Sequence, residues 1–166
     1  PTHWDDIDTS QCILVATSTV SPCTTGKFKK IFWAEADSPH RMWMYKWEKQ
    51  LCPGIDLLPS PDQNTGLSAA GVAVYLGAKK ILLVGIDLCL SPQGHTHSDL
   101  WHRSKNKHVI HAETVTNNLG QHCQTIYGLF IQGFEDLAAK CPQVEFIQTS
   151  ATGVALKGMV YRELSV

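Results

Sequence analysis

Residues 65–87 read TGLSAAGVAVYLGAKKILLVGID and contain, in immediate succession, the pattern of a helix, a tight stop and a buried strand. Small and apolar residues recur at helical spacing on one face, namely Leu67, Ala70, Gly71 and Val74. Gly77 follows as the C-terminal stop residue. Residues 81–85 are apolar without alternation, which is typical of a parallel strand covered by helices on both faces. The stretch therefore predicts half of a crossover unit, with Asp87 at the carboxyl end of its strand, where parallel sheets bind ligands.

Shorter patterns predict the remaining elements. Apolar runs predict strands at residues 12–16, 27–33, 55–58, 144–147 and 159–164. A helix is expected at residues 38–50, because Ser38 and Pro39 suit its first positions. An apolar three-four spacing predicts a second helix at residues 120–140, which Pro142 ends. The order of these elements predicts one α/β domain with a mostly parallel sheet over residues 1–166.

Composition narrows the functional class. The chain has 166 residues, of which 43% are hydrophobic, and no apolar run reaches the length of a membrane span. Its 14 Lys and Arg against 15 Asp and Glu predict no general attraction to nucleic acid. The six cysteines are scattered without a CxxC pair, and the opening PTHWDDIDTS is unlike a signal peptide. We therefore expect a cytoplasmic protein with free thiols.

The expected helix at residues 38–50 is rich in large apolar side chains. Trp43 and Trp47 are four residues apart and share a face, and Met44 lies beside Trp47. Such a face predicts packing on the sheet or on a second copy of the chain, and hence a homo-oligomer. The alternative is a stacking surface for a flat heterocycle.

Three segments meet at one rim if the sheet is parallel. They are the helix start with Gly66 and Ser68, the strand end at Asp87, and the loop that contains Thr152 and Gly153. A helix start offers N–H donors and a positive dipole end, which suit a phosphate group. The local sequence NTGLS matches neither the dinucleotide nor the P-loop spacing, so the alternative is an ordinary helix cap.

Asp87 is the predicted metal ligand and a predicted catalytic residue. Its carboxylate suits Mg²⁺ beside a phosphate, a ribose hydroxyl, or the orientation of a histidine. The alternative is a carboxylate that only caps the next turn.

Residues 88–118 have weak periodicity and hold five of the eight histidines. Loops of this length are uncommon in compact domains unless they are functional or mobile. His95 and His97 alternate in GHTHSD and project to one side of an extended loop, so we predict them as general acid or base near neutral pH. Arg103 lies in a basic stretch that suits the outer phosphates of a nucleotide.

A zinc site is the alternative use of this loop. Its ligands would include His108, His111 and Glu113, but no HExxH motif or Cys-His spacing accompanies them.

The run GLSAAGVAVYLGAKKILLVGIDL, followed by GHTHSD, resembles the signature of the family of MptE-like 6-hydroxymethylpterin diphosphokinases and flagellar motility accessory factors. The ending TGVALKGMVYRELS is similar to the closing segment of that family, and the resemblance covers residues 65–166. It implies a Rossmann-like three-layer fold and a nucleotide-dependent transferase. One branch transfers pyrophosphate from ATP to a hydroxymethyl pterin with Mg²⁺. The other is linked to flagellin glycosylation and is similar to sialyltransferases that use a nucleotide sugar.

The sequence departs from the family pattern at one point. Family members carry a Gly-Pro-Ser-Leu phosphate loop after their first strand, and this chain has no such motif. We therefore expect a fragment that lacks an upstream phosphate-loop segment, or a divergent member. A non-catalytic binding or assembly domain remains the third alternative.

Overall fold

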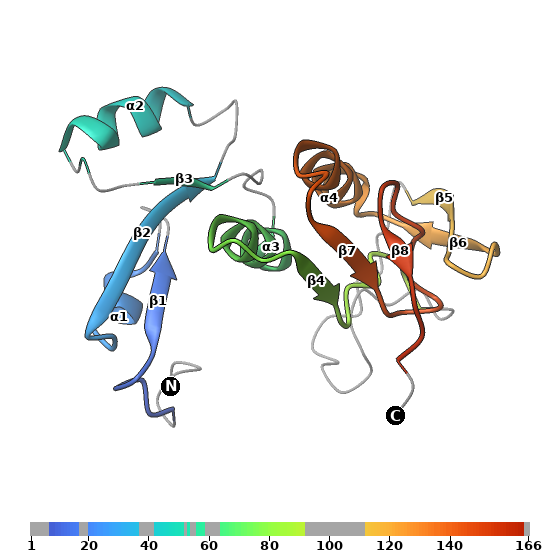
Figure 1. Ribbon diagram of the computed structural model, residues 1–166, viewed down its shortest axis with the longest axis horizontal. Helices are drawn as coiled ribbons and strands as arrows, with labels where there is room; N and C mark the ends of the chain where they lie inside the picture. The colour runs from blue at the N-terminus through green and yellow to red at the C-terminus, as the bar shows by residue number, and fades with distance from the viewer. Residues whose placement is uncertain are drawn as a thin grey trace. The chain divides into compact units, whose positions relative to one another are not determined.

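The computed structural model describes residues 7–16, 20–36, 42–51, 53, 56–58, 64–91 and 112–164 (Figure 1). The fold is mixed α/β, and most strand pairs are parallel, as the sequence predicts. The chain divides into two compact units, Pro1–Asp62 and Gln63–Val166, which are taken in turn below. The expectation of a single domain stays a prediction.

The first unit is built on a small parallel sheet. Its elements are β1 Ile13–Ala16, α1 Pro22–Thr25, β2 Lys30–Ala36, α2 Met42–Leu51 and β3 Asp56–Leu58, and the strand order is β1-β2-β3. The strand predicted at residues 27–33 begins three residues later, because the N–H groups of Lys27 and Phe28 bond back to carbonyl groups of α1. Ser21 caps α1 by accepting from the Cys23 N–H at 3.3 Å.

The expected helix with the Trp-rich face is present as α2, Met42–Leu51. The side chain of Trp47 is 61% exposed. The side chains of Trp43 and Met44 lie outside the described residues, so the predicted homo-oligomer contact stays a prediction.

The second unit contains a parallel sheet, two helices and a hairpin. Its elements are α3 Thr65–Tyr75, β4 Lys80–Leu83, β5 Glu113–Thr116, β6 His122–Thr125, α4 Gly128–Lys140, β7 Glu145–Gln148 and β8 Val160–Tyr161. The sheet order is β4-β7-β8, with Ile81 opposite Phe146. The β5 and β6 strands form a separate antiparallel pair.

The predicted helix-stop-strand unit is confirmed as α3 and β4. Asn64 caps α3 through its Oδ1, which accepts from the Leu67 N–H at 2.8 Å. Leu67, Ala70 and Gly71 are buried on the predicted face. Gly77 has a φ of +87°, in the left-handed region where glycine is favoured at helix ends.

The core of this unit lies between one face of the sheet and the two helices. Leu67, Phe134 and Leu137 are fully buried and pack with Ile81 and Phe146, among others. Each such side chain contributes about 1.5–3 kcal/mol to folding through burial.

The described residues do not show the expected helical cover on both faces of β4. Burial alternates along Lys80–Leu83, and Leu82 is 47% exposed while Leu83 is buried. The side chains on the exposed face of β4 therefore behave as in a sheet with one covered face. The Rossmann-like three-layer arrangement remains a prediction.

The predicted helix at residues 120–140 is wrong over its first part, because only Gly128–Lys140 is helical. The preceding residues pair with β5, where Val115 lies opposite Cys123. Asn117 shapes the intervening turn, since its Oδ1 accepts from the N–H groups of Leu119 and Gln121. Pairing with a distant strand thus overrides the local helical spacing.

The predicted strands near the C-terminus are confirmed as β7 and β8. Residues 113–116 form β5, so this part of the expected long loop is a strand. No helix in the described parts of the chain is long and apolar enough to cross a membrane.

Candidate functional site

The start of α3 lies against the segment that follows β4. A Cβ added at Gly66 would lie 3.0 Å from Ile86 Cδ1, so the absence of a side chain at Gly66 permits this approach. Ile86 immediately precedes Asp87. The first turn of the helix and the predicted carboxylate therefore belong to one corner of the unit.

The loop after β7 packs on Asp87 from another side. A Cβ added at Gly153 would lie 3.2 Å from Asp87 Cα, and the Val154 N–H donates to the Asp87 carbonyl oxygen at 2.8 Å. Gly153 is buried and Asp87 is exposed. The structure thus brings Gly66, Asp87 and Gly153 to the carboxyl end of β4, where the sequence places them.

The two predicted hydroxyl residues lie on the same segments. Ser68 is half-buried in the first turn of α3, where its N–H donates to the Asn64 carbonyl oxygen at 3.0 Å. Thr152 is exposed, and its carbonyl oxygen accepts from the Cys89 thiol at 3.4 Å. Thr152 therefore connects the loop after β7 to the segment after β4 through its backbone.

Asn64 carries an unpaired donor at the start of α3. Its Nδ2 is buried and has no hydrogen-bond partner among the described residues, although its Oδ1 caps the helix. A buried donor without a partner costs about 1–3 kcal/mol.

Leu88 is the residue that sequence reasoning missed at this corner. Its φ is +52°, in the left-handed region that non-glycine residues seldom adopt. The Leu88 carbonyl oxygen accepts from Thr125 Oγ1 at 2.6 Å, and Thr125 is fully buried. Strained backbone of this kind clusters at functional sites, and here it follows directly after Asp87.

The thiol of Cys89 is the titratable group with the largest shift at this corner among the described residues. Burial raises its pKa to about 11, and the nearby Cys123 and Asp87 add to the shift through their negative charge. Burial also raises the pKa of Cys123, while the interaction with Cys89 acts in the opposite direction. The Cys89 thiol therefore stays protonated near neutral pH.

His95, His97 and Arg103 lie outside the described residues, as do His108 and His111 of the zinc alternative. Glu113 is described, and its carboxylate lies near the start of α4. A Cβ added at Gly128 would lie 3.3 Å from Glu113 Oε2. A carboxylate is favoured beside a helix N-terminus, and Glu113 occupies such a position.

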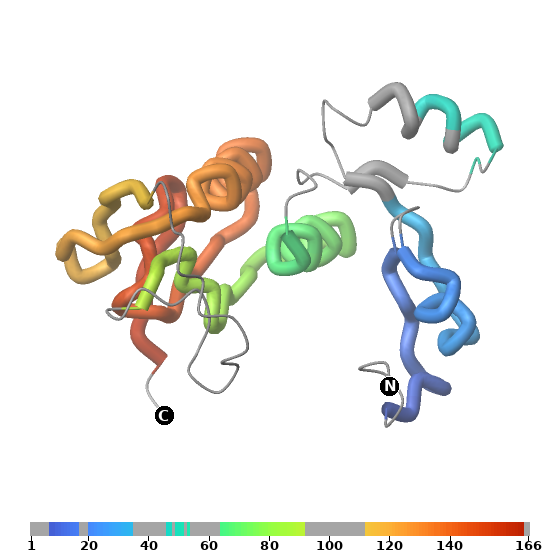
Figure 2. Tube along the Cα trace, turned by 180° about the vertical axis from the view of Figure 1, so that it is seen from behind, coloured from blue at the N-terminus to red at the C-terminus, as the bar shows by residue number. Residues whose placement is uncertain are grey.

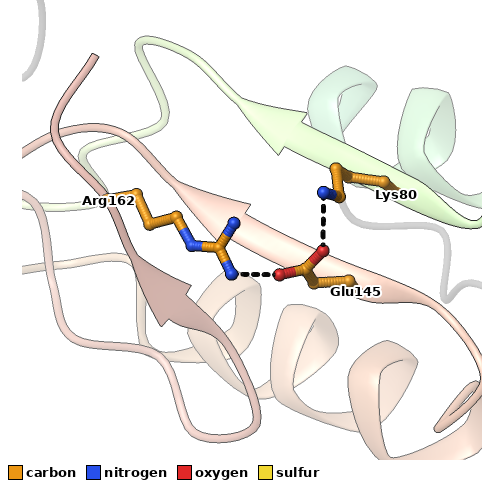
Figure 3. A network of polar contacts seen from close by, with 3 residues as sticks. All are labelled: Lys80, Glu145 and Arg162. Atoms are coloured by element: carbon orange, nitrogen blue, oxygen red, sulfur yellow. Dashed lines mark hydrogen bonds and ion pairs between the residues drawn. The ribbon is translucent and has the colours of Figure 1, made fainter. Parts of the chain in front are cut away.

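A charged network lies at the opposite end of β4 from Asp87 (Figure 3). The Glu145 carboxylate accepts from Lys80 Nζ at 3.0 Å and also pairs with the Arg162 guanidinium. The hydrogen bond from Lys80 and the charge of Arg162 hold the pKa of Glu145 below its ordinary value. These three residues connect β4, β7 and the residue after β8.

Comparisons with protein-family models, curated proteins and solved structures found no match to this chain. The resemblance to the MptE-like family therefore stays a prediction.

Proposed function

We propose that the unit Gln63–Val166 carries the nucleotide-phosphate site of a transferase with a Rossmann-like arrangement. The observation that carries this proposal is the position of Asp87 between the start of α3 and the loop after β7. Ligands of parallel α/β sheets bind at the carboxyl ends of strands, which is the end of β4 that Asp87 follows.

Two glycines support a phosphate at this corner. Gly66 lies in the first turn of α3, an 11-residue helix whose positive dipole end favours an anion. Gly153 lies against the backbone of Asp87. Because Gly66 has no side chain, the backbone N–H groups at the start of α3 are accessible to phosphate oxygens in this proposal, and the buried Gly153 lets the loop after β7 approach Asp87.

The exposed carboxylate of Asp87 is the proposed Mg²⁺ ligand. Mg²⁺ prefers oxygen ligands and commonly joins one or two carboxylates to the phosphates of a nucleotide. His97, with His95, is the proposed acid or base, and Arg103 is the proposed clamp for the outer phosphates.

The reaction that we propose is pyrophosphate transfer from ATP to a hydroxymethyl pterin. The test compares this reaction with two alternatives, which are transfer from a nucleotide sugar and a purely binding or assembly role. Each of the three functions predicts a different response to nucleotides, so the nucleotide that binds distinguishes them.

Calorimetric titration tests the proposal. We expect heat with ATP plus Mg²⁺, and at least about a tenfold weaker affinity (~1.4 kcal/mol) in Asp87→Asn. The matched control is Asp136→Asn, because Asp136 is an exposed carboxylate on α4 that accepts only from Gln132 in the bonds described. Heat only with a CMP-sugar would replace the diphosphokinase by a glycosyltransferase, and heat with neither nucleotide would favour the binding or assembly role.

A further inference from the structure

Cys89 and Cys123 lie side by side although 33 residues separate them in the chain. Hydrogen bonds flank Cys89: the Leu90 N–H donates to the Gln124 carbonyl oxygen at 2.7 Å, and Thr125 Oγ1 donates to the Leu88 carbonyl oxygen at 2.6 Å. The segment after β4 therefore runs along β6 (Figure 2). Both cysteines pack against the same core, and both are free thiols.

The two side chains are also neighbours, because each is among the causes that shift the pKa of the other. A disulfide requires Cα atoms about 4.4–6.8 Å apart. The hydrogen bond from Leu90 to Gln124 joins the two backbones one residue after each cysteine, and in this proposal it holds Cys89 and Cys123 within reach of such a bond.

We propose that Cys89 and Cys123 form a reversible intramolecular disulfide when the protein meets a peroxide. In the first step, Cys123 loses its proton and its thiolate attacks one peroxide oxygen; the O–O bond breaks, Cys123 becomes a sulfenic acid, and the departing hydroxide takes up that proton as water. In the second step, the Cys89 sulfur attacks the Cys123 sulfur, the S–O bond breaks, and the Cys89 proton leaves with the oxygen as a second water. Two thiols are oxidised and one peroxide is reduced to two water molecules.

The hydrogen bond of the Cys89 thiol supports this order. Cys89 Sγ donates to the Thr152 carbonyl oxygen at 3.4 Å, a bond that only the protonated thiol makes, so this bond disfavours ionisation of Cys89. The nucleophile of a thiol is its thiolate, so Cys123 reacts first and Cys89 resolves the sulfenic acid.

Peptide mass spectrometry after treatment with hydrogen peroxide tests the proposal. The remaining thiols are alkylated before digestion, and dimedone is added to trap sulfenic acid. We expect a Cys89–Cys123 cross-link to be the main oxidation product in the wild type, and a reducing agent to remove it. We expect dimedone on Cys123 in Cys89→Ser, and little oxidation of Cys89 in Cys123→Ser. Cys12→Ser is the control, because Cys12 is exposed and lies in the first unit.

The proposal is overturned if peroxide oxidises Cys12 or Cys23 while Cys89 and Cys123 remain reduced. A cross-link that joins two chains, or one that pairs Cys89 with another cysteine, would also overturn it. None of these measurements uses a nucleotide, so their outcome is separate from that of the proposed function.

Discussion

The Val154 N–H donates to the carbonyl oxygen of Asp87 over 2.8 Å, which fastens the loop after β7 to the end of β4. The bond uses the backbone of Asp87 and leaves its carboxylate exposed. The structural role at this corner is therefore carried by backbone atoms and the proposed chemical role by the carboxylate, so the two can be separated by substitution.

Asp87→Asn is expected to leave the melting temperature nearly unchanged, because the hydrogen bond to Val154 is made by the main chain. Exposed substitutions of this kind usually change stability by less than about 0.5 kcal/mol. The proposed transferase activity, measured on the same preparation, should be abolished. A large fall in melting temperature with activity per folded molecule intact would assign Asp87 a structural role instead.

Gly153→Ala is expected to destabilise the protein by about 1–3 kcal/mol. The added Cβ would lie 3.2 Å from both Asp87 Cα and Ser150 Cβ, and backbone on one side leaves little room to adjust. Urea unfolding measures the change. Gly26→Ala is the control, since its Cβ would meet only the Pro22 carbonyl oxygen at an ordinary 3.4 Å, and equal effects at both positions would contradict the steric argument.

Asn64→Ala and Asn64→Ser separate the effect of the Asn64 amide oxygen on stability from that of the amide nitrogen. The alanine variant loses the cap on the Leu67 N–H and should be less stable by about 1 kcal/mol. Serine keeps an acceptor at this position and removes the buried, unpartnered Nδ2, so its free energy of unfolding should equal or exceed that of the wild type. If serine were as destabilising as alanine in urea unfolding, the capping explanation would fail.

Glu145 should make stability depend on pH. Its pKa is lower in the folded state because Lys80 and Arg162 stabilise the carboxylate, so the ionised form stabilises the fold. This contribution is complete above the ordinary glutamate pKa of about 4.3 and is lost as the pH falls through the lower folded value. The stability difference between wild type and Glu145→Gln should therefore shrink below about pH 4.

High salt and Lys80→Gln are the controls for this effect. Salt screens exposed ion pairs, and Lys80→Gln removes one of the two cations paired with Glu145, so each should reduce the difference between wild type and Glu145→Gln. A pH-independent difference would show that the charge of Glu145 does not contribute.

The Cys89 thiol should react slowly with iodoacetamide near neutral pH. Its pKa of about 11 leaves little thiolate in the folded protein, and the rate should rise steadily with pH up to that value. The comparison is the same residue in urea-unfolded protein, whose ordinary pKa is about 8.5. Equal rates in the two states at pH 8 would show that burial does not protect this thiol.

The sequence predicts α3 and β4 because every local signal agrees. The Asn64 cap, the face of Leu67 and Ala70 and the stop at Gly77 are all encoded within a few residues of one another. The meeting of Gly66, Asp87 and Gly153 follows in turn from the parallel direction of β4 and β7.

The hairpin and the thiol pair were not accessible to the same reasoning. Cys123 fits a helical spacing with its neighbours, but its position is fixed by pairing with Val115. The approach of the Cys89 segment to Cys123 depends on where β6 lies, which is a long-range property. The positive φ of Leu88 likewise has no signal in the sequence, because leucine rarely adopts it.

The hydroxyl of Thr125 links the segment after β4 to the start of α4. It donates to the Leu88 carbonyl oxygen and accepts from the Tyr127 N–H at 2.9 Å, one residue before α4 begins at Gly128. A ligand that displaced Leu88 would therefore loosen the first turn of α4 through a single side chain. The amide hydrogen exchange rate at the start of α4 is thus expected to change when a ligand binds at Asp87, and this change should be absent in Thr125→Val.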